Sequence, residues 1–278
     1  MTSTTRRPAR PPLDETALRG ALLAGSRLFT SLEVVASTGS TNADLLASAR
    51  AGAPAGTILV AEEQTAGRGR LDRRWQSQPG AALLFSVLLR PAGVPPGSRG
   101  WLPLLTGVAV ATAIRAQTGL EASLKWPNDV LSGSGIPGVS GKLAGILAEQ
   151  SGEAIVVGDG LNVSTDRDEL PAPQATTLWL EGAAGADRQA ILLAALRQLE
   201  YWYLRWSGSP EPGNAAASGL RGEYQRLCST IGRDVRVELP GGSFLTGRAS
   251  GVDDIGRLLV SAADGEHAVS AGDVVHVR

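Results

Sequence analysis

The chain has 278 residues, of which 43% are hydrophobic, and a formal net charge of −1. This length suits one large domain, or one domain with a small one appended, and the apolar fraction is ample for a buried core. A charge near zero argues against a protein that coats nucleic acid, because that function requires a basic face. The sequence contains no uncharged apolar run of about 18 residues, so we expect no membrane span.

Cysteine and histidine are scarce. The single cysteine, Cys228, cannot form an internal disulfide, which favours a reducing compartment, and we expect a cytoplasmic protein. Both histidines, His267 and His276, lie near the C-terminus, so the first 266 residues cannot supply a Ser-His-Asp or Cys-His nucleophilic site. A dedicated zinc site would also have few ligands to use.

The first 229 residues predict a mixture of helices and strands. Residues 1–13 combine arginines and prolines without an acid, and we expect a short disordered tail there. Thr41 and Asp44 fit a capping box at the start of the second predicted helix. The predicted helices occupy residues 14–23, 40–52, 102–117 and 187–206, and the predicted strands residues 32–36, 57–62, 83–89, 123–126, 143–149 and 154–157.

The last fifty residues predict only short strands, at 235–239, 243–251, 257–260, 266–269 and 274–277. Glycine pairs and Asp-Gly between them suit tight hairpin turns, and five such strands are typical of a small barrel. We therefore expect an α/β (α+β) fold with a mixed sheet flanked by helices, followed by a C-terminal all-β barrel. The expected domains are a tail at 1–13, a catalytic domain at 14–229 and the barrel at 230–278.

Only two of the 26 basic residues are lysines, Lys125 and Lys142. Lysine carries a compact point charge on a flexible stem, whereas arginine presents a wide planar fork. A lysine retained in such a background can be one that arginine cannot replace, although a composition bias would also explain the scarcity. Lys125 opens the stretch KWPND, and Lys142 opens KLAGIL.

Three further stretches, together with the end of KWPND, contain residues suited to binding an anionic or polar ligand. The run GRGRLDRRW at residues 67–75 combines glycines, which allow close backbone approach, with arginines, which bind phosphate or carboxylate. Asp129 ends the KWPND turn, where a carboxylate could hold Mg²⁺. Ser40, Thr41 and Asn42 start a helix, and GDGLN at 158–162 follows a strand. Each stretch alone is equally compatible with a solvated loop, a turn or a helix cap.

Taken in order, however, the series STN, GRGRxxRxW, KWPND, GKLAGIL and GxGxN closely resembles the biotin protein ligases, and the terminal barrel resembles their C-terminal domain. The resemblance covers most of residues 30–278. It implies a catalytic domain related in fold to class II aminoacyl-tRNA synthetases. The segment before residue 30 is too short for the DNA-binding domain of members that are also repressors, so we expect no DNA partner.

The resemblance implies that biotin and ATP, with Mg²⁺, form biotinyl-5′-adenylate, and that biotin then passes to a lysine of a biotin carboxyl carrier domain. It implies Lys142, Arg70 and Asp129 as catalytic residues, with Asp129 as the candidate Mg²⁺ ligand. The implied biotin-binding residues are Ser40, Thr41, Asn42, Gln64, Gly67, Arg68, Gly69, Arg70, Lys142, Gly145 and Gly160. The implied ATP-binding residues are Arg68, Arg70, Trp75, Lys125, Asn128, Asp129, Lys142 and Asn162. The oligomeric state stays open, a homodimer included.

Three features depart from the family pattern: Asp72 in the arginine loop, Asp159 between two pocket glycines, and a long Gly/Ser-rich connection at 131–141. An ionised carboxylate at position 159 would be costly if buried without a partner. Two alternative functions remain. One is a lipoate or octanoate ligase or transferase of the same fold, and the other is a non-catalytic nucleotide- or RNA-binding module.

Overall fold

The computed structural model describes residues 8–71, 73–133, 135, 140–239 and 241–277. A seven-stranded sheet forms the centre of the larger part of the molecule, with strand order β1-β2-β3-β7-β6-β5-β4. Only β1 and β2 pair in parallel, and the other neighbours are antiparallel. The strands are β1 (Ser31–Val35), β2 (Thr57–Ala61), β3 (Ala82–Leu89), β4 (Ala122–Lys125), β5 (Asp129–Ser132), β6 (Lys142–Ser151) and β7 (Ala154–Asn162).

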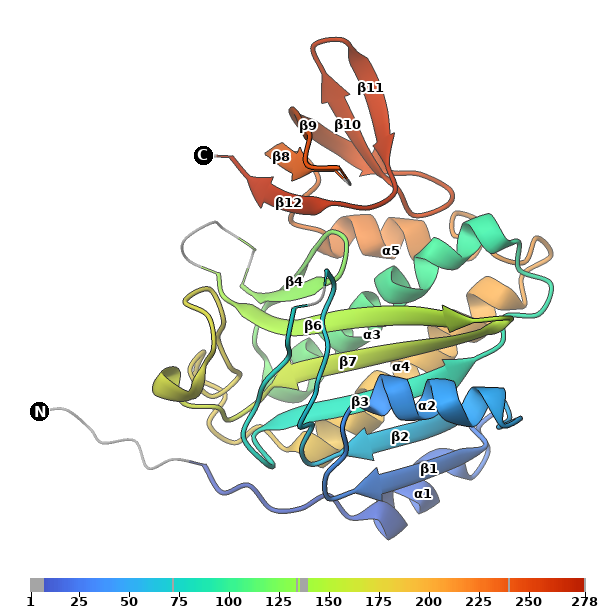
Figure 1. The fold of residues 1–278 in the computed structure, drawn as a ribbon, viewed down its shortest axis with the longest axis vertical. Coiled ribbons are helices and arrows are strands. Elements are labelled where there is room, and N and C mark those ends of the chain that lie inside the picture. The colour runs from blue at the N-terminus through green and yellow to red at the C-terminus, as the bar shows by residue number, and fades with distance from the viewer. Residues whose placement is uncertain (1–7, 72, 134, 136–139, 240, 278) are drawn as a thin grey trace, which may run out of the picture.

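Helices cover both faces of this sheet, which confirms the predicted mixed sheet flanked by helices. In Figure 1, α2 lies across one face, and α3 and α4 lie behind the other. Residues of β3 and β7 are buried along their whole length because both faces are covered. The helices are α1 (Glu15–Leu23), α2 (Thr41–Arg50), α3 (Trp101–Thr118), α4 (Arg188–Ser207) and α5 (Leu220–Leu227), with 3₁₀ turns at Pro96–Gly100 and Arg167–Glu169.

The main core lies between the sheet and the α3–α4 pair. Gly107 of α3 permits this close packing, because a Cβ there would lie 3.2 Å from a methyl carbon of Leu124 and 3.4 Å from one of Ile146. Fully buried aromatic side chains, including Trp101 and Trp206, complete the core. None of the helices in the described part of the chain is long and apolar enough to span a membrane.

The C-terminal strands form a separate five-stranded antiparallel sheet with the order β11-β10-β9-β8-β12, above α5 in Figure 1. The two end strands, β11 and β12, are not neighbours in that order. This sheet contacts the larger one directly, because Trp126 Nε1 donates to the carbonyl of Gly256 at 3.1 Å. The strands are β8 (Asp234–Glu238), β9 (Phe244–Val252), β10 (Leu258–Ala262), β11 (Gly265–Val269) and β12 (Asp273–His276).

Several local expectations need correction. Ser40 rather than Thr41 caps α2, because its side chain accepts from the amide of Ala43. Asp44, the expected capping-box partner, instead accepts a hydrogen bond from the hydroxyl of Thr38. The structure also contains β5 and α5, which the sequence analysis did not predict. Asp72 and residues 134 and 136–139 of the long connection lie outside the described residues.

The segment before α1 contacts the domain where it is described. Arg10 donates to the carbonyl of Ser164 and to Glu169, both at 2.8 Å. The amide of Leu13 donates to Glu62 at 2.7 Å. Residues 10 and 13 of the expected tail therefore contact the folded domain in the structure. Residues 1–7 of the expected tail lie outside the described residues.

Candidate active site

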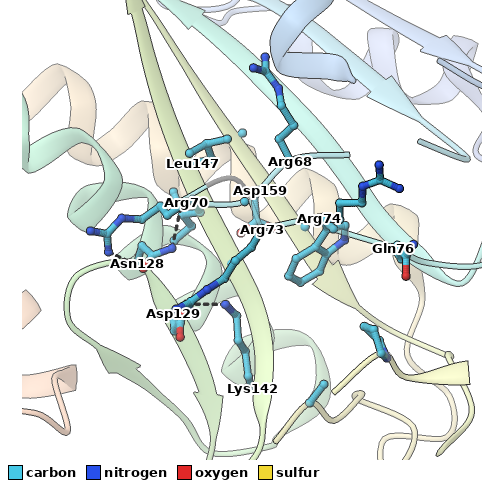
Figure 2. A pocket seen from close by; sticks show the side chains of 18 of the residues that line it. Arg68, Arg70, Arg73, Arg74, Gln76, Asn128, Asp129, Lys142, Leu147 and Asp159 are labelled. Carbon is cyan, nitrogen blue, oxygen red and sulfur yellow. Dashed lines mark hydrogen bonds and ion pairs between the residues drawn. The ribbon is translucent and has the colours of Figure 1, made fainter. Parts of the chain in front are cut away.

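A cavity of about 200 Å³ lies on the α2 face of the sheet, at the centre of β6 and β7. We call it the central cavity. Its walls come from segments far apart in sequence: the start of α2, the arginine loop at 67–75, the turn after β4, the middle of β6 and β7, and residues 171–175. Figure 2 shows Lys142 directed at Asp129 and Arg70 at Asn128, while the guanidinium groups of Arg68 and Arg74 point away from these pairs.

One end of the central cavity is lined mainly by hydroxyl and amide groups, and Asn42 there also donates to Glu149 Oε2 at 2.8 Å, the carboxylate that pairs with Arg68. The carbonyl oxygen of Gln64 accepts from the amide of Thr41 at 2.8 Å and lies 3.0 Å from its hydroxyl. Ser86 Oγ lies 2.7 Å from Thr41 Oγ1 and 2.6 Å from Asn42 Oδ1. Ser40, Thr41 and Asn42 are all buried. These side chains hold one another in fixed positions, so this end presents donors and acceptors suited to a neutral polar head group.

The arginine loop folds back on itself over the cavity. The amide of Gly69 donates to the carbonyl of Arg73 at 2.7 Å, and that of Trp75 donates to Gly67 at 2.9 Å. Leu71 sits at the turn with φ of 55°, a strained value for a residue with a Cβ. The loop directs Arg68, Arg70, Arg73 and Arg74 to the cavity wall.

Lys142 and Arg70 converge at the opposite end. Lys142 Nζ lies 2.6 Å from Asp129 Oδ1, and Arg70 Nη1 donates to Asn128 Oδ1 at 3.1 Å. Asn128 is held in turn by Nδ2, which donates to the carbonyl of Ile146 at 3.0 Å. Burial lowers the pKa of Arg70, the effect of desolvation exceeding the attraction of Asp273 and Asp129. Two fixed cations at this end favour an anionic ligand.

Glycines form the floor between the two ends, and the indole of Trp75 lies directly on them. A Cβ added to Gly160 would lie 2.5 Å from the indole, and one added to Gly145 would lie 3.1 Å from it. Lys142 Nζ lies 5.9 Å from the centroid of the same ring. Since only glycine leaves room for the ring, these two positions determine where Trp75 packs.

Asp159 lies between the pocket glycines and lines the cavity, but the alternation along β7 directs its side chain toward the other face of the sheet. Gly158 and Gly160 face the cavity, and the regular strand register places Asp159 beside Phe85 and Ile146 of the main core. No described residue gives either carboxylate oxygen a hydrogen-bond partner. Burial raises the pKa of Asp159 to about 8, opposed by the charge of Lys142. At neutral pH its carboxyl group is therefore mainly protonated.

Most of the residues expected at the site line this cavity, but Gly67 and Lys125 do not. Gly67 acts through the backbone, by accepting from Trp75. Lys125 ends β4 beside the C-terminal sheet, where its charge contributes to a lowered pKa of His276. Asn162 lines the cavity and donates through Nδ2 to the carbonyl of Thr176 at 3.2 Å.

The sequence analysis missed several lining residues, among them Arg73, Arg74, Gln76, Pro171, Ala172, Gln174, Ala175 and Asp273. Arg73 and Arg74 stand inside the recognised loop motif, so their charge was a signal that could have found them. Asp273 comes from β12 and forms an ion pair with Arg73. Nothing in the sequence around Asp273 indicates that pairing, because it depends on how the C-terminal sheet packs against the larger domain.

In the described part of the chain, no three His, Cys, Asp or Glu side chains are grouped so that they could hold a metal ion. Asp129 and Asp273 are the carboxylates at the cationic end of the cavity. Each is already paired with a cation, Lys142 and Arg73 respectively. A metal ion brought by a phosphate ligand would therefore compete with these pairs for carboxylate oxygens.

Two family models match the chain. The biotin/lipoate A/B protein ligase family matches residues 33–166, and the biotin protein ligase C-terminal domain matches residues 230–277. A biotin–[acetyl-CoA-carboxylase] ligase of Mycobacterium tuberculosis is 44% identical over 99% of this chain and 100% of its own length. A bifunctional ligase/repressor of Bacillus spizizenii is 32% identical over 87% of this chain and 72% of its own length.

Solved structures agree with these matches. A biotin protein ligase from Aquifex aeolicus in complex with biotin and ATP aligns with a TM-score of 0.72 and 30% identity, over 90% of this chain and all of that one. The fold and the cavity thus define an enzyme of the biotin/lipoate ligase class. Within that class, the chain belongs to the biotin protein ligase family.

Proposed function

We propose that this protein is an ATP-dependent biotin protein ligase that forms biotinyl-5′-adenylate and transfers biotin to a lysine of a biotin carboxyl carrier domain. The observation that carries the proposal is the convergence of Arg70 and Lys142 on one cavity whose other end is lined mainly by hydroxyl and amide groups. A carboxylic acid with a neutral polar head group fits that asymmetry. Relatives named as biotin–[acetyl-CoA-carboxylase] ligases support the same substrate and an acetyl-CoA carboxylase as the acceptor's source.

The end lined mainly by hydroxyl and amide groups is assigned to the head group of biotin. Ser40, Thr41 and Gln64 supply hydroxyl and amide groups there, and Asn42 completes the wall. The glycine floor at Gly145 and Gly160, with the indole of Trp75, accommodates the apolar chain of the acid. In this assignment Trp75 contacts the acyl chain, and Gly67, Arg68 and Gly69 position the loop that covers it.

The cationic end is assigned to the reacting groups. Lys142 and Arg70 hold the carboxylate of biotin and the α-phosphate of ATP together, which reduces their mutual repulsion. A carboxylate oxygen attacks the α-phosphorus, and the bond to the departing pyrophosphate breaks. Asn128 and Asp129 hold Arg70 and Lys142 in place, while Arg68 and Asn162 contribute to the nucleotide side. Lys125 lies outside the cavity wall and is assigned at most a longer-range electrostatic role.

The second step needs a neutral amine. The acceptor lysine attacks the carbonyl carbon of the adenylate, an amide bond forms, AMP departs, and the amine loses a proton. Asp129 is the carboxylate closest to Lys142 and is our candidate for accepting that proton. Mg²⁺ would accompany ATP, and the carboxylate of Asp129 would be its protein ligand. We also propose that residues 14–229 act as the catalytic domain and 230–278 as a C-terminal domain.

The decisive test is exchange of labelled pyrophosphate into ATP. The proposal requires exchange that depends on added biotin, because the adenylate forms only when the acid is bound. Exchange without biotin, or no exchange at all with folded protein, would refute it. Thermal-shift measurements with biotin and lipoate test the alternative within the same fold, since a lipoate ligase would be stabilised by lipoate instead. A non-catalytic nucleotide-binding module would bind ATP but give no exchange.

A further inference from the structure

A second cavity, of about 340 Å³, lies where the C-terminal sheet meets the catalytic domain. We call it the junction cavity. Its walls are the 3₁₀ turn at Pro96–Gly100 with the start of α3, the Trp126-Pro127 turn, the hairpin at 255–257, and Ser270-Ala271 before β12. Both domains therefore contribute to it. The substrates assigned above to the central cavity leave the junction cavity without a role.

The junction cavity is cationic. Arg70 and Arg257 line it, and none of the described residues that line it is acidic. Arg257 Nε pairs with Asp253 Oδ2 at 2.6 Å, which fixes the direction of the guanidinium. An arginine carries five N–H donors, so its terminal nitrogens can still bind an oxyanion. Arg70 Nη2 lies 3.4 Å from the carbonyl of Gly272, which ties it to the same domain boundary.

Arg70 lines both cavities, so the two spaces adjoin at this residue. The residues that line the central cavity form three groups, which we take as three directions from Lys142: Thr41 with Gln64, Gln76 with the segment that holds Pro171 and Gln174, and Arg70 with Asn128. Figure 2 shows Arg70 and Asn128 on the far side of the Lys142–Asp129 pair from Gln76. With the acid in the first direction and the nucleoside in the second, only the third stays available to a leaving group.

The chemistry places a leaving group there. Attack on the α-phosphorus proceeds with the attacking and leaving oxygens roughly in line. The pyrophosphate must therefore depart on the side away from the head-group end, past Arg70. We propose that the junction cavity is the binding site for the leaving pyrophosphate, with Arg257 as the cation that binds its distal phosphate. This inference rests on the proposed adenylate-forming function and adds a residue from the C-terminal domain to it.

The test is a titration of pyrophosphate in the biotin-dependent exchange assay, at saturating biotin and ATP. Arg257→Gln should raise the pyrophosphate concentration for half-maximal exchange about tenfold, the usual effect of losing a charge-assisted hydrogen bond. The KM for biotin should not change. Arg257→Lys, which keeps the charge, should give a smaller increase. Thermal-shift measurements should show that pyrophosphate stabilises the wild type more than Arg257→Gln, and that orthophosphate does not discriminate between them.

Arg221→Gln is the matched control. Arg221, on α5, pairs at 2.6 Å with Asp254, which belongs to the same hairpin as Arg257, but Arg221 does not line the junction cavity. A second pair of variants leaves the hairpin at 255–257 unchanged. Ala271→Asp adds a negative charge to the wall of the junction cavity, and Ala268→Asp adds one on β11 outside that cavity. Ala271→Asp should raise the pyrophosphate requirement and Ala268→Asp should not.

An unchanged pyrophosphate requirement in Arg257→Gln, or an equal increase in Arg221→Gln, would overturn the inference. In both cases wild-type exchange would still support the ligase assignment. Absence of biotin-dependent exchange in the wild type would instead remove the proposed function itself. The two failures are therefore distinguishable.

Discussion

Lys142 occupies a position in which the shape of the cation matters as well as its charge. Its amine lies between Asp129 at 2.6 Å and the Trp75 ring at 5.9 Å, and a Cβ on Gly145 would come within 3.2 Å of it. A planar guanidinium is wider than an ammonium group and would have to displace one of these neighbours. This crowding explains why one of only two lysines in the chain stands here.

Lys142→Ala should therefore fold normally and lose about a hundredfold or more of its biotin-dependent exchange, because the α-phosphate loses a fixed cation. The side chain is 29% exposed, so its removal leaves no large cavity in the core. Lys142→Arg should lose a comparable amount despite keeping the charge. Initial exchange rates check both variants, with unfolding midpoints as the folding control. Near-normal exchange by Lys142→Ala would remove Lys142 from the catalytic set.

Asp159 should make the stability of the protein depend on pH. In the unfolded chain its carboxyl group titrates near the ordinary value of 3.8, whereas burial raises the pKa to about 8 in the folded protein. Between these values the folded state retains a proton that the unfolded state releases. The free energy of unfolding therefore falls as pH rises from about 4 to about 8, by at most about 1.4 kcal/mol per pH unit from this group.

Asp159→Asn should abolish that contribution, because the amide does not titrate. As pH rises towards 8, the unfolding free energy of the variant should increase relative to that of the wild type. Above pH 8 the difference between the two should level off. Urea unfolding at several pH values between 4 and 9 measures it. A difference that stays constant over this range would show that Asp159 is ionised in the folded protein.

At the scale of single residues, much of the candidate site could be predicted, and Asp159 shows the limit. Its departure from the family pattern was visible in the sequence, but the face to which its side chain points depends on strand register. The sequence predicted a strand only over 154–157 and interpreted the glycines that follow as its end. In the structure β7 continues to Asn162, because β3 and β6 pair with it on both sides and supply the stabilisation that glycines lack.

At the scale of elements, the missed helix and strand have different causes. The helix α5 has buried Leu220, Tyr224 and Leu227 at helical spacing, but it is short and contains Gly222. The strand β5 has only four residues. Because they follow the Trp126-Pro127 turn so closely, the sequence pattern does not distinguish them from that turn. The helix α4 was predicted because its buried residues recur at helical spacing over many turns, and α3 because its apolar run is too long for a strand.

The strand β12 is anchored to the catalytic domain through a chain of hydrogen bonds. The amide of Trp126 donates to Thr230 Oγ1 at 3.1 Å, and Thr230 Oγ1 lies 3.1 Å from Nε2 of His276. A hydroxyl that accepts from an amide can still donate its own hydrogen to a neutral imidazole nitrogen. Burial, with the nearby charges of Lys125 and Arg233, lowers the pKa of His276 to about 4.

Mild acid should therefore loosen β12. Below the ordinary pKa of 6.5 the unfolded state binds a proton that the folded state does not, so stability falls as pH drops from about 6.5 to about 4. The side chain is partly exposed, which makes the effect smaller than for a fully buried group. Protection factors of the β8 and β12 amides, which correct hydrogen exchange for its intrinsic slowing in acid, should fall over this range in the wild type and not in His276→Gln. An equal fall in both would assign the effect to other groups.

At the scale of the whole molecule, the least predictable feature is how the two sheets meet. The number and rough positions of the C-terminal strands followed from alternation and glycine turns. The packing of this sheet against the larger domain could not be predicted. It depends on single contacts such as the hydrogen bond that Trp101 Nε1 donates to the carbonyl of Asp254 at 2.9 Å. The ion pair between Arg73 and Asp273, and the junction cavity, depend on the same packing. Long-range packing of this kind leaves no local pattern in the sequence.

The low lysine content also has a consequence for the whole molecule. An acyl-adenylate that leaves the site reacts with amines indiscriminately, and this chain offers only Lys125, Lys142 and its N-terminal amine. Lys142 is paired with Asp129, and Lys125 is partly buried at the end of β4. The protein should therefore acquire little biotin when it is incubated with biotin and ATP in the absence of an acceptor.

Intact-mass spectrometry after such an incubation measures this directly, and peptide mapping locates any label. We expect substoichiometric labelling, with the N-terminal amine as the main target. A matched variant that carries two new exposed lysines, Arg248→Lys and Arg226→Lys, should acquire more label at those positions while its biotin-dependent exchange is unchanged, because neither residue lines the central cavity. Extensive labelling of the wild type would show that the scarcity of lysine offers no protection, and would leave composition bias as its explanation.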